Sequence, residues 1–175
     1  QSYAACKGGD LSGDGLWNVM DIVQLANCVL AATCGGDNVQ TGEPGIENGC
    51  AADMNGDTFY NVMDIVILAN CVLAGNCGGR VDDAAQSKLI MTDNMMSIEA
   101  DGFIGGVEMT ITHGADFKIQ MTDKALHADY LTYGTETRLL VITPETEELF
   151  TYTGAFEITE VIVANSHAEV SVDLP

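Results

Sequence analysis

The stretch that decides the fold is Asp10-Leu-Ser-Gly-Asp-Gly-Leu-Trp-Asn-Val-Met-Asp21. The same pattern returns 43 residues later as Asp53-Met-Asn-Gly-Asp-Thr-Phe-Tyr-Asn-Val-Met-Asp64. The repetition continues through Leu25–Leu30 and Leu68–Leu73, and into the Cys-Gly-Gly that closes each copy. Two copies of one unit predict a small domain with pseudo-twofold symmetry.

Apolar residues follow each stretch at spacings of three and four, which is typical of one face of an α-helix. They are Val19, Ile22, Val23, Ala26, Val29 and Leu30, then Val62, Ile65, Val66, Ala69, Val72 and Leu73. Each unit is therefore predicted to be a loop followed by a helix. The Gly-Gly pairs after Cys34 and Cys77 are expected to stop the helices, and residues 35–50 are expected to connect them.

Oxygen-bearing residues occupy each stretch at the spacing that calcium requires. Calcium takes six to eight hard oxygen ligands, and a 12-residue loop supplies them from positions 1, 3, 5, 7, 9 and 12. The first loop offers Asp10, Ser12, Asp14, the Leu16 carbonyl, Asn18 and Asp21. The second offers Asp53, Asn55, Asp57, the Phe59 carbonyl, Asn61 and Asp64. The doubled match predicts two calcium sites.

Position six, where the chain must turn sharply, differs between the loops. It is Gly15 in the first loop and Thr58 in the second. Because a β-branched residue disfavours positive φ, the second loop is expected to be strained or to bind calcium more weakly. At position eight, Trp17 and Tyr60 are expected to pack in the core.

All six cysteines lie in the first 77 residues: Cys6, Cys28, Cys34, Cys50, Cys71 and Cys77. An even number in a small region indicates disulfides and an oxidising compartment. Local pairs Cys28–Cys34 and Cys71–Cys77, leaving Cys6 with Cys50, are favoured over pairing Cys34 with Cys50 and Cys77 with Cys6. The chain opens on Gln1 without a leader, so we expect a secreted, extracellular product whose signal peptide has been removed.

The charge balance is 26 acidic residues against 6 basic ones, a net charge of −20. Nucleic-acid binding needs clustered Lys and Arg, so it is excluded. No apolar run approaches the roughly 18 residues that span a bilayer, so no membrane span is expected. A chain this acidic repels itself unless cations neutralise it, which favours a calcium-rich or saline setting.

From about residue 86 the pattern changes to short alternating runs punctuated by glycines. The runs are Val107–Ile111, Phe117–Met121, Leu139–Ile142, Leu149–Tyr152, Phe156–Val161 and Glu169–Leu174. They predict an antiparallel β-sandwich of about eight strands over residues 86–175. The expected fold class is α+β overall, with a small all-α calcium domain over residues 1–80 preceding the sandwich.

Asp at position twelve, a helix only after each loop, and the pairing of two repeats resemble the dockerin family over residues 6–79. The resemblance implies a small calcium-dependent module that plugs into a cohesin domain in an extracellular assembly. It also implies which positions face the partner. These are Val19, Met20, Ala26, Asn27 and Ala31, then Val62, Met63, Ala69, Asn70 and Ala74. Their small, apolar character predicts either a hydrophobic contact or a face buried within the chain.

The second half resembles a cohesin-type sandwich in two stretches, Met96–Ile111 and Phe156–Asn165. It contains no Gly-x-Ser-x-Gly, His-Glu-x-x-His or phosphate-loop motif, so no enzyme is expected. Several residues there have side chains that could serve other roles. Glu145, Glu147 and Glu148 are expected to be solvated, Tyr130, Tyr133 and Tyr152 to pack rather than bind sugar, His113, His127 and His167 to be structural or exposed, and Asp82, Asp83, Asp93 and Asp101 are a weak further calcium candidate.

The favoured function is an extracellular, calcium-stabilised structural protein that assembles head to tail with copies of itself into a filament. Either Glu169–Leu174 or Gln1–Ala5 could add to a neighbour's sheet edge. The alternatives are a monomeric dockerin-type module that binds a cohesin scaffold, and a β-sandwich that binds a surface or glycan. In each, calcium binding is expected to supply folding energy to the loops.

Overall fold

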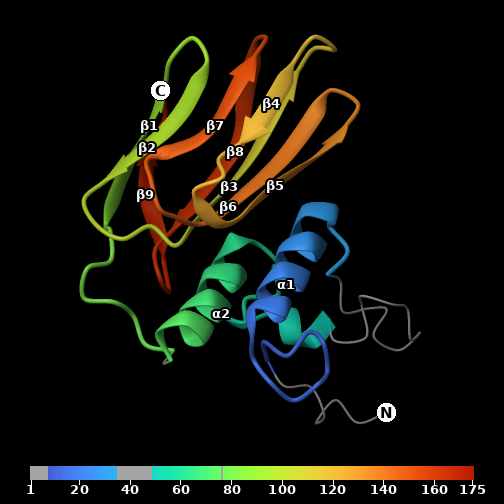
Figure 1. The fold of residues 1–175 in the computed structure, drawn as a ribbon, viewed down its shortest axis with the longest axis vertical. Coiled ribbons are helices and arrows are strands. Elements are labelled where there is room, and N and C mark those ends of the chain that lie inside the picture. The colour runs from blue at the N-terminus through green and yellow to red at the C-terminus, as the bar shows by residue number, and fades with distance from the viewer. Residues whose placement is uncertain (1–7, 35–48, 76) are drawn as a thin grey trace. The chain divides into compact units, whose positions relative to one another are not determined.

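The structure is a computed structural model, and it describes residues 8–34, 49–75 and 77–175. The chain divides into two compact units, Gln1–Gly78 and Gly79–Pro175 (Figure 1). Among the described residues, the helices lie in the first unit and the strands in the second. In the described part of the chain, no helix has the length and apolar character needed to cross a membrane.

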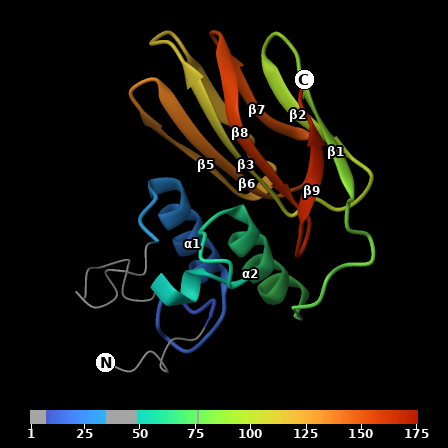
Figure 2. The same cartoon turned by 180° about the vertical axis from the view of Figure 1, so that it is seen from behind.

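Two helices of equal length dominate the first unit: α1 (Val19–Ala31) and α2 (Val62–Ala74), with the short 3₁₀ helix η3 (Gly49–Ala52) between them. Figures 1 and 2 show α1 and α2 side by side and running in opposite directions. The predicted apolar faces form their core. Its fully buried side chains include Ile22, Leu25, Ala26, Val62, Ile65 and Leu68. Val19 and Leu73, expected on those faces, are 44% and 52% exposed.

Each helix begins with the same capping box. The side chain of Asn18 accepts a hydrogen bond from the Met20 N–H, while Asp21 accepts one from the Asn18 N–H. Asn61 and Asp64 repeat the arrangement in α2. Two of the N–H groups that a helix start leaves unpaired are thereby satisfied.

The helices end earlier than predicted, so the prediction that the Gly-Gly pairs stop them was wrong. Ala32 (φ 56°) and Gly75 (φ 72°) adopt the left-handed conformation and close the last turns. In α1 the Ala32 N–H donates back to the carbonyls of Cys28 and Val29. The reversal happens at the C-cap itself because that residue, and not a later glycine, satisfies the terminal carbonyls.

The predicted local disulfides are confirmed: Cys28 pairs with Cys34, and Cys71 with Cys77. Each bridge links the last turns of a helix to the residues just beyond its end. The expected third pair, Cys6 with Cys50, lies outside the residues whose side chains the structure describes.

The second unit is a β-sandwich of nine strands, one more than expected. They are β1 (Gln86–Met91), β2 (Met95–Ala100), β3 (Gly106–His113), β4 (Lys118–Met121), β5 (Ala125–Tyr133), β6 (Glu136–Pro144), β7 (Glu148–Thr153), β8 (Phe156–Ala164) and β9 (Glu169–Asp173). The strand order is β4-β7-β2-β1-β9-β8-β3-β6-β5. The six predicted runs fall in β3, β4, β6, β7, β8 and β9, whereas β1, β2 and β5 had not been singled out.

Strand β9 joins the two sheets of the sandwich. Its first residues, Glu169 and Val170, pair with β8, and Ser171–Asp173 then pair with β1. The β1–β9 pair is parallel, while all the other strand pairs are antiparallel. Because β9 is already paired on both sides, it cannot be donated to a neighbour's sheet without opening its own. The other expected donor, Gln1–Ala5, lies outside the described residues.

The sandwich core is built by strand alternation. Along β3, Val107, Met109 and Ile111 are fully buried, while Glu108 and Thr110 between them are half-buried on the other face. Phe150 on β7 is fully buried in the same core. Successive side chains of a strand point to opposite faces, so this alternation fixes the register of the sheet.

Candidate metal centres

Three carboxylates converge in the second loop. One carboxylate oxygen from each of Asp53, Asp57 and Asp64 lies within 4.8 Å of the other two. Within the described ranges 8–34, 49–75 and 77–175, no other three acidic, His or Cys side chains approach so closely. Asp64 is buried, Asp53 half-buried and Asp57 exposed, so the group opens to solvent on one side. Its all-oxygen chemistry suits a hard divalent cation such as calcium.

Backbone N–H groups hold these carboxylates in place from behind. Asp53 accepts from the N–H groups of Gly56 and Thr58, both at 3.0 Å. Asp57 accepts from the Phe59 N–H at 2.9 Å. The loop backbone is therefore wrapped around its own aspartates, and its N–H groups orient each carboxylate.

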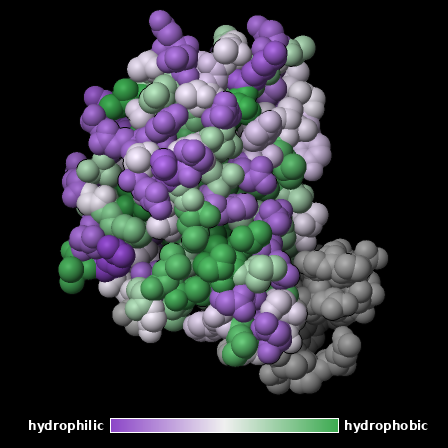
Figure 3. Space-filling view, in the orientation of Figure 1, coloured by the Kyte–Doolittle hydropathy of each residue, from purple (hydrophilic) through white to green (hydrophobic). Residues whose placement is uncertain are grey.

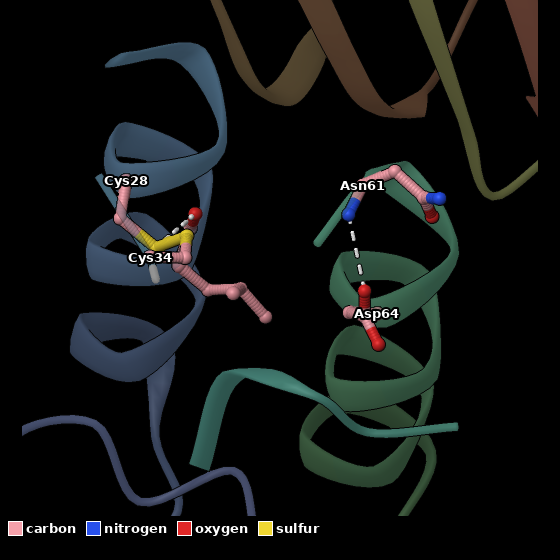
Figure 4. Close-up of a disulfide and its surroundings, with 5 residues drawn as sticks. Cys28, Cys34, Asn61 and Asp64 are labelled. Atoms are coloured by element: carbon pink, nitrogen blue, oxygen red, sulfur yellow. Dashed lines mark hydrogen bonds between the residues drawn. A yellow bond between two sulfur atoms is a disulfide. The ribbon is translucent and has the colours of Figure 1, made fainter. Parts of the chain in front are cut away.

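Asp64 connects the loop to the helix. One of its oxygens accepts from the Met54 N–H at 2.8 Å at the start of the loop, and the other from the Asn61 N–H at 3.1 Å (Figure 4). The pKa of Asp64 is raised to about 6, chiefly because the carboxyl is buried. The hydrogen bonds from these N–H groups act in the opposite direction, and the charge of nearby Asp53 adds a smaller increase. A cation beside Asp64 would stabilise its charged form.

The first loop repeats this hydrogen-bond pattern. Asp10 accepts from the N–H groups of Gly13 (2.9 Å) and Gly15 (2.8 Å). Buried Asp21 accepts from the N–H groups of Ser12 and Asn18, both at 3.0 Å. The third carboxylate of this loop is Asp14, and hydrogen bonds from the Leu16 N–H and the Ser12 hydroxyl lower its pKa. Asp10, Asp14 and Asp21 are not gathered to within the distance found in the second loop.

The remaining predicted ligands occupy two kinds of position. Asn18 and Asn61 serve as helix N-caps, and Asn55 donates to Asp57 at 3.1 Å. Leu16 and Phe59, whose carbonyls are the expected ligands, expose their side chains by 65% and 68%. The exposure fits a role that uses only the backbone. Trp17 is 37% exposed, so its expected place in the core was wrong, and Tyr60 is half-buried.

Position six of each loop has positive φ, as its place in the turn requires. Gly15 has φ 85° and Thr58 has φ 67°. The expected strain at Thr58 is therefore present, because a β-branched residue in this region costs of the order of 1–3 kcal/mol. Whether the second loop binds calcium more weakly stays a prediction.

The weaker calcium candidate in the second unit is not brought together. Asp82 pairs with Arg80 at 2.9 Å, and Asp83 accepts from Ser166 and His167. Asp101 accepts from the N–H groups of Ala85 and Gln86, and these bonds lower its pKa. Each carboxylate is thus engaged separately.

The tyrosines do not form a platform. Tyr152 packs against Phe117 and Phe156 and donates to the Thr92 carbonyl. Tyr130 and Tyr133 lie three residues apart on β5, and three is an odd separation, so they face opposite sides of the strand. Of the three histidines, His113 stacks on Phe117, His127 lies on β5, and His167 lies in the turn before β9. Glu145 and Glu147 are exposed, and Glu148 beside them is half-buried.

Residues 8–73 match the family model of the dockerin type I domain. This part of the chain is dockerin-like. The match confirms the resemblance inferred from the paired loops, and dockerin type I domains bind calcium. No curated protein matches the sequence.

Two solved cohesin structures are similar to part of the chain. The non-cellulosomal cohesin from the hyperthermophilic archaeon Archaeoglobus fulgidus shares 10% identity at a TM-score of 0.40, over 51% of this chain and 86% of that one. The cohesin module from a family 33 glycoside hydrolase of Clostridium perfringens shares 13% at a TM-score of 0.33, over 53% of this chain and 99% of that one.

Proposed function

We propose that this chain is an extracellular, calcium-stabilised docking protein whose dockerin-like unit binds a cohesin-type domain. The observation that carries the proposal is the pair of loop-and-helix repeats, each with aspartates held by its own backbone at calcium-ligand spacing. The role is structural, not catalytic. The two disulfides fit an oxidising, extracellular setting.

The ligands would be Asp10, Ser12, Asp14, Leu16, Asn18 and Asp21 in the first loop, and Asp53, Asn55, Asp57, Phe59, Asn61 and Asp64 in the second. Bound calcium would neutralise the crowded carboxylates. Asp21 and Asp64 would couple calcium binding to the helices, because each accepts hydrogen bonds from the loop and from the N-cap residue of the following helix. An ordered loop thereby fixes the start of its helix.

The two copies present different surfaces to a partner. Val19, Met20 and Asn27 of the first copy are exposed, whereas at the matching positions of the second copy Val62 and Asn70 are buried and Met63 is half-buried. Figure 3 shows an apolar patch over the helix pair. An exposed apolar patch of this kind supports a protein–protein contact made mainly through the first copy.

A second candidate is head-to-tail assembly, in which the dockerin-like unit of one copy binds the β-sandwich of the next. What supports it is the presence of both kinds of unit in one chain, the paired loops and helices before residue 79 and the nine-stranded sandwich after it. Because the two binding surfaces would lie on different units, the contacts would not close and a filament would grow.

Light scattering and negative-stain imaging in calcium and after chelation test both candidates. Oligomers or filaments that dissociate on chelation would support head-to-tail assembly. A monomer in both states would exclude head-to-tail assembly. Binding to a separate cohesin-type domain would then be tested by titration with such domains. If the chain neither self-associates nor binds any cohesin-type domain in calcium, the docking function is overturned.

A further inference from the structure

The junction between the two units is held on the side of the first unit. The Asn70 side chain on α2 donates to the Gly78 carbonyl at 2.6 Å. The Cys71–Cys77 disulfide ties the residue just before Gly78 to the same helix. The chain leaving α2 is therefore fastened up to Gly78.

The junction is held equally firmly on the side of the second unit. A Cβ placed on Gly79 would lie 2.8 Å from two atoms of the His167 ring, so this glycine packs directly under the imidazole. The next N–H, of Arg80, donates to Asp83 at 3.0 Å and to the Ser166 hydroxyl at 3.1 Å. His167 and Ser166 lie in the turn between β8 and β9.

Asp83 is the centre of this second fastening, and its side chain is only 10% exposed. Besides Arg80, it accepts from the Ser166 N–H (3.0 Å), the Ser166 hydroxyl (2.7 Å) and His167 Nδ1 (3.1 Å). Burial alone would raise the pKa of Asp83, but the bonds from Ser166 and Arg80 outweigh it and lower the pKa. The carboxylate is thus held as an ionised acceptor.

Further contacts hold the rest of the segment against the sandwich. The Arg80 guanidinium lies 4.0 Å above the centroid of the Phe103 ring. The Phe103 N–H donates to the Asp82 carbonyl at 2.6 Å, and the Ala84 N–H donates to the Phe103 carbonyl at 3.1 Å. A Cβ on Gly102 would lie 2.4 Å from the Asp82 carbonyl, so this close approach requires glycine.

We propose that residues 79–84 form a latch, closed by Asp83 on Ser166 and His167, that confines motion between the two units to a hinge at Gly78-Gly79. If residues 77–84 were free, a glycine-containing linker of this length would have a root-mean-square span of about 15 Å. With both sides fastened, the mobile link is a single peptide unit, about 3.8 Å between Cα atoms. The contacts that close the latch all lie within the second unit, whereas the calcium loops lie in the first.

Limited trypsin digestion tests the latch, because the Arg80–Val81 bond lies inside it and cleavage there separates the units. Digestion is done in calcium, with a synthetic peptide of residues 77–88 as the unfolded reference. We expect the native chain to be cut at least tenfold more slowly than the peptide. Asp83→Ala and Ser166→Ala should each raise the rate at least threefold, whereas Asp123→Ala, in an exposed turn, should not.

Ser166→Ala is the sharper variant because it leaves the sequence around the cleavage site unchanged. Hydrogen exchange of the Arg80 and Ala84 amides, with the melting temperature of the sandwich, separates an open latch from an unfolded domain. Cleavage of the native chain at the rate of the peptide would overturn the proposal. So would unchanged protection of both amides in Asp83→Ala and Ser166→Ala.

Discussion

The two loops share one pattern of hydrogen bonds but differ in the burial of their first ligand, in the residue at position six and in how closely their carboxylates lie. In the first, Asp10 is 7% exposed, position six is glycine, and the carboxylates stay apart. In the second, Asp53 is half-buried, Thr58 occupies positive φ, and three carboxylates crowd together around the buried Asp64.

From this difference we expect two repeats with the same ligand spacing to depend on a metal to different degrees. Crowded carboxylates repel one another until a cation lies between them. The strain at Thr58 also persists only while the surroundings hold that residue in place. We therefore infer that the second loop depends more on calcium for its structure than the first.

The largest effect is expected from removing calcium altogether. At calcium a thousandfold above the dissociation constant, each site stabilises the fold by about 4 kcal/mol. One kcal/mol shifts the melting temperature of a small domain by about 4–8 °C, so chelation should lower that of the dockerin-like unit by 15 °C or more. Calorimetry should show the sandwich transition unmoved, since both loops lie in the first unit. Equal shifts of both transitions would contradict this.

The next largest effect should come from replacing the first ligand of each loop with alanine, and it should distinguish the two loops. In calcium, Asp53→Ala and Asp10→Ala should each cost up to about 4 kcal/mol, the stabilisation from one site. After chelation, Asp10→Ala should still cost about 1–3 kcal/mol, because it removes the acceptor of two N–H groups at a buried position. Asp53→Ala, at a half-buried position, should then cost less. The measurement is urea unfolding with and without calcium.

An equal residual cost of the two aspartate variants in chelator would break the comparison between the loops. A larger cost for Asp53→Ala would reverse it. Asp123→Ala, in an exposed turn of the sandwich, is the matched control and should change neither curve.

The disulfides extend the comparison to the helix ends. Each closes a short loop and should stabilise by about 2 kcal/mol. Cys28 and Cys34 are both buried, whereas Cys77 is exposed. A mild dithiol reductant should therefore open Cys71–Cys77 first, as read by mass spectrometry after alkylation. Opening of Cys28–Cys34 first would show that burial does not control access here.

Features set by neighbouring residues could be predicted from the sequence. The ligand spacing from Asp10 to Asp21, the periodicity after it, and the six-residue separation of Cys28 and Cys34 are local, and the helices and bridges follow from them. The positive φ at Thr58 was also predictable, because position six of the loop requires the turn whatever residue stands there.

Features set by distant residues could not be predicted. The sequence offers Asp83 as a candidate calcium ligand, but its actual partners, Ser166 and His167, lie more than 80 residues away in the chain. The parallel pairing of β9 with β1 likewise joins strands from the beginning and the end of the sandwich sequence. The helix end at Ala32 could not be predicted because alanine has no preference for the left-handed conformation. The surrounding structure imposes that conformation on it.

The smallest expected effect is the most direct test of the difference at position six. Thr58→Gly relieves the strain at φ 67° but adds flexibility to the unfolded chain, so the net gain in stability should be about 0.5–1 kcal/mol. Gly15→Thr is the matched reverse change, and no atom lies within 4 Å of a Cβ placed at that position. Its cost, about 1–2 kcal/mol, would therefore come from the backbone alone. Calcium titration by calorimetry should show tighter binding in Thr58→Gly and weaker binding in Gly15→Thr. Identical calcium affinity in both variants and the native chain would mean that strain at position six does not distinguish the loops, and that the crowding around Asp64 accounts for any difference between them.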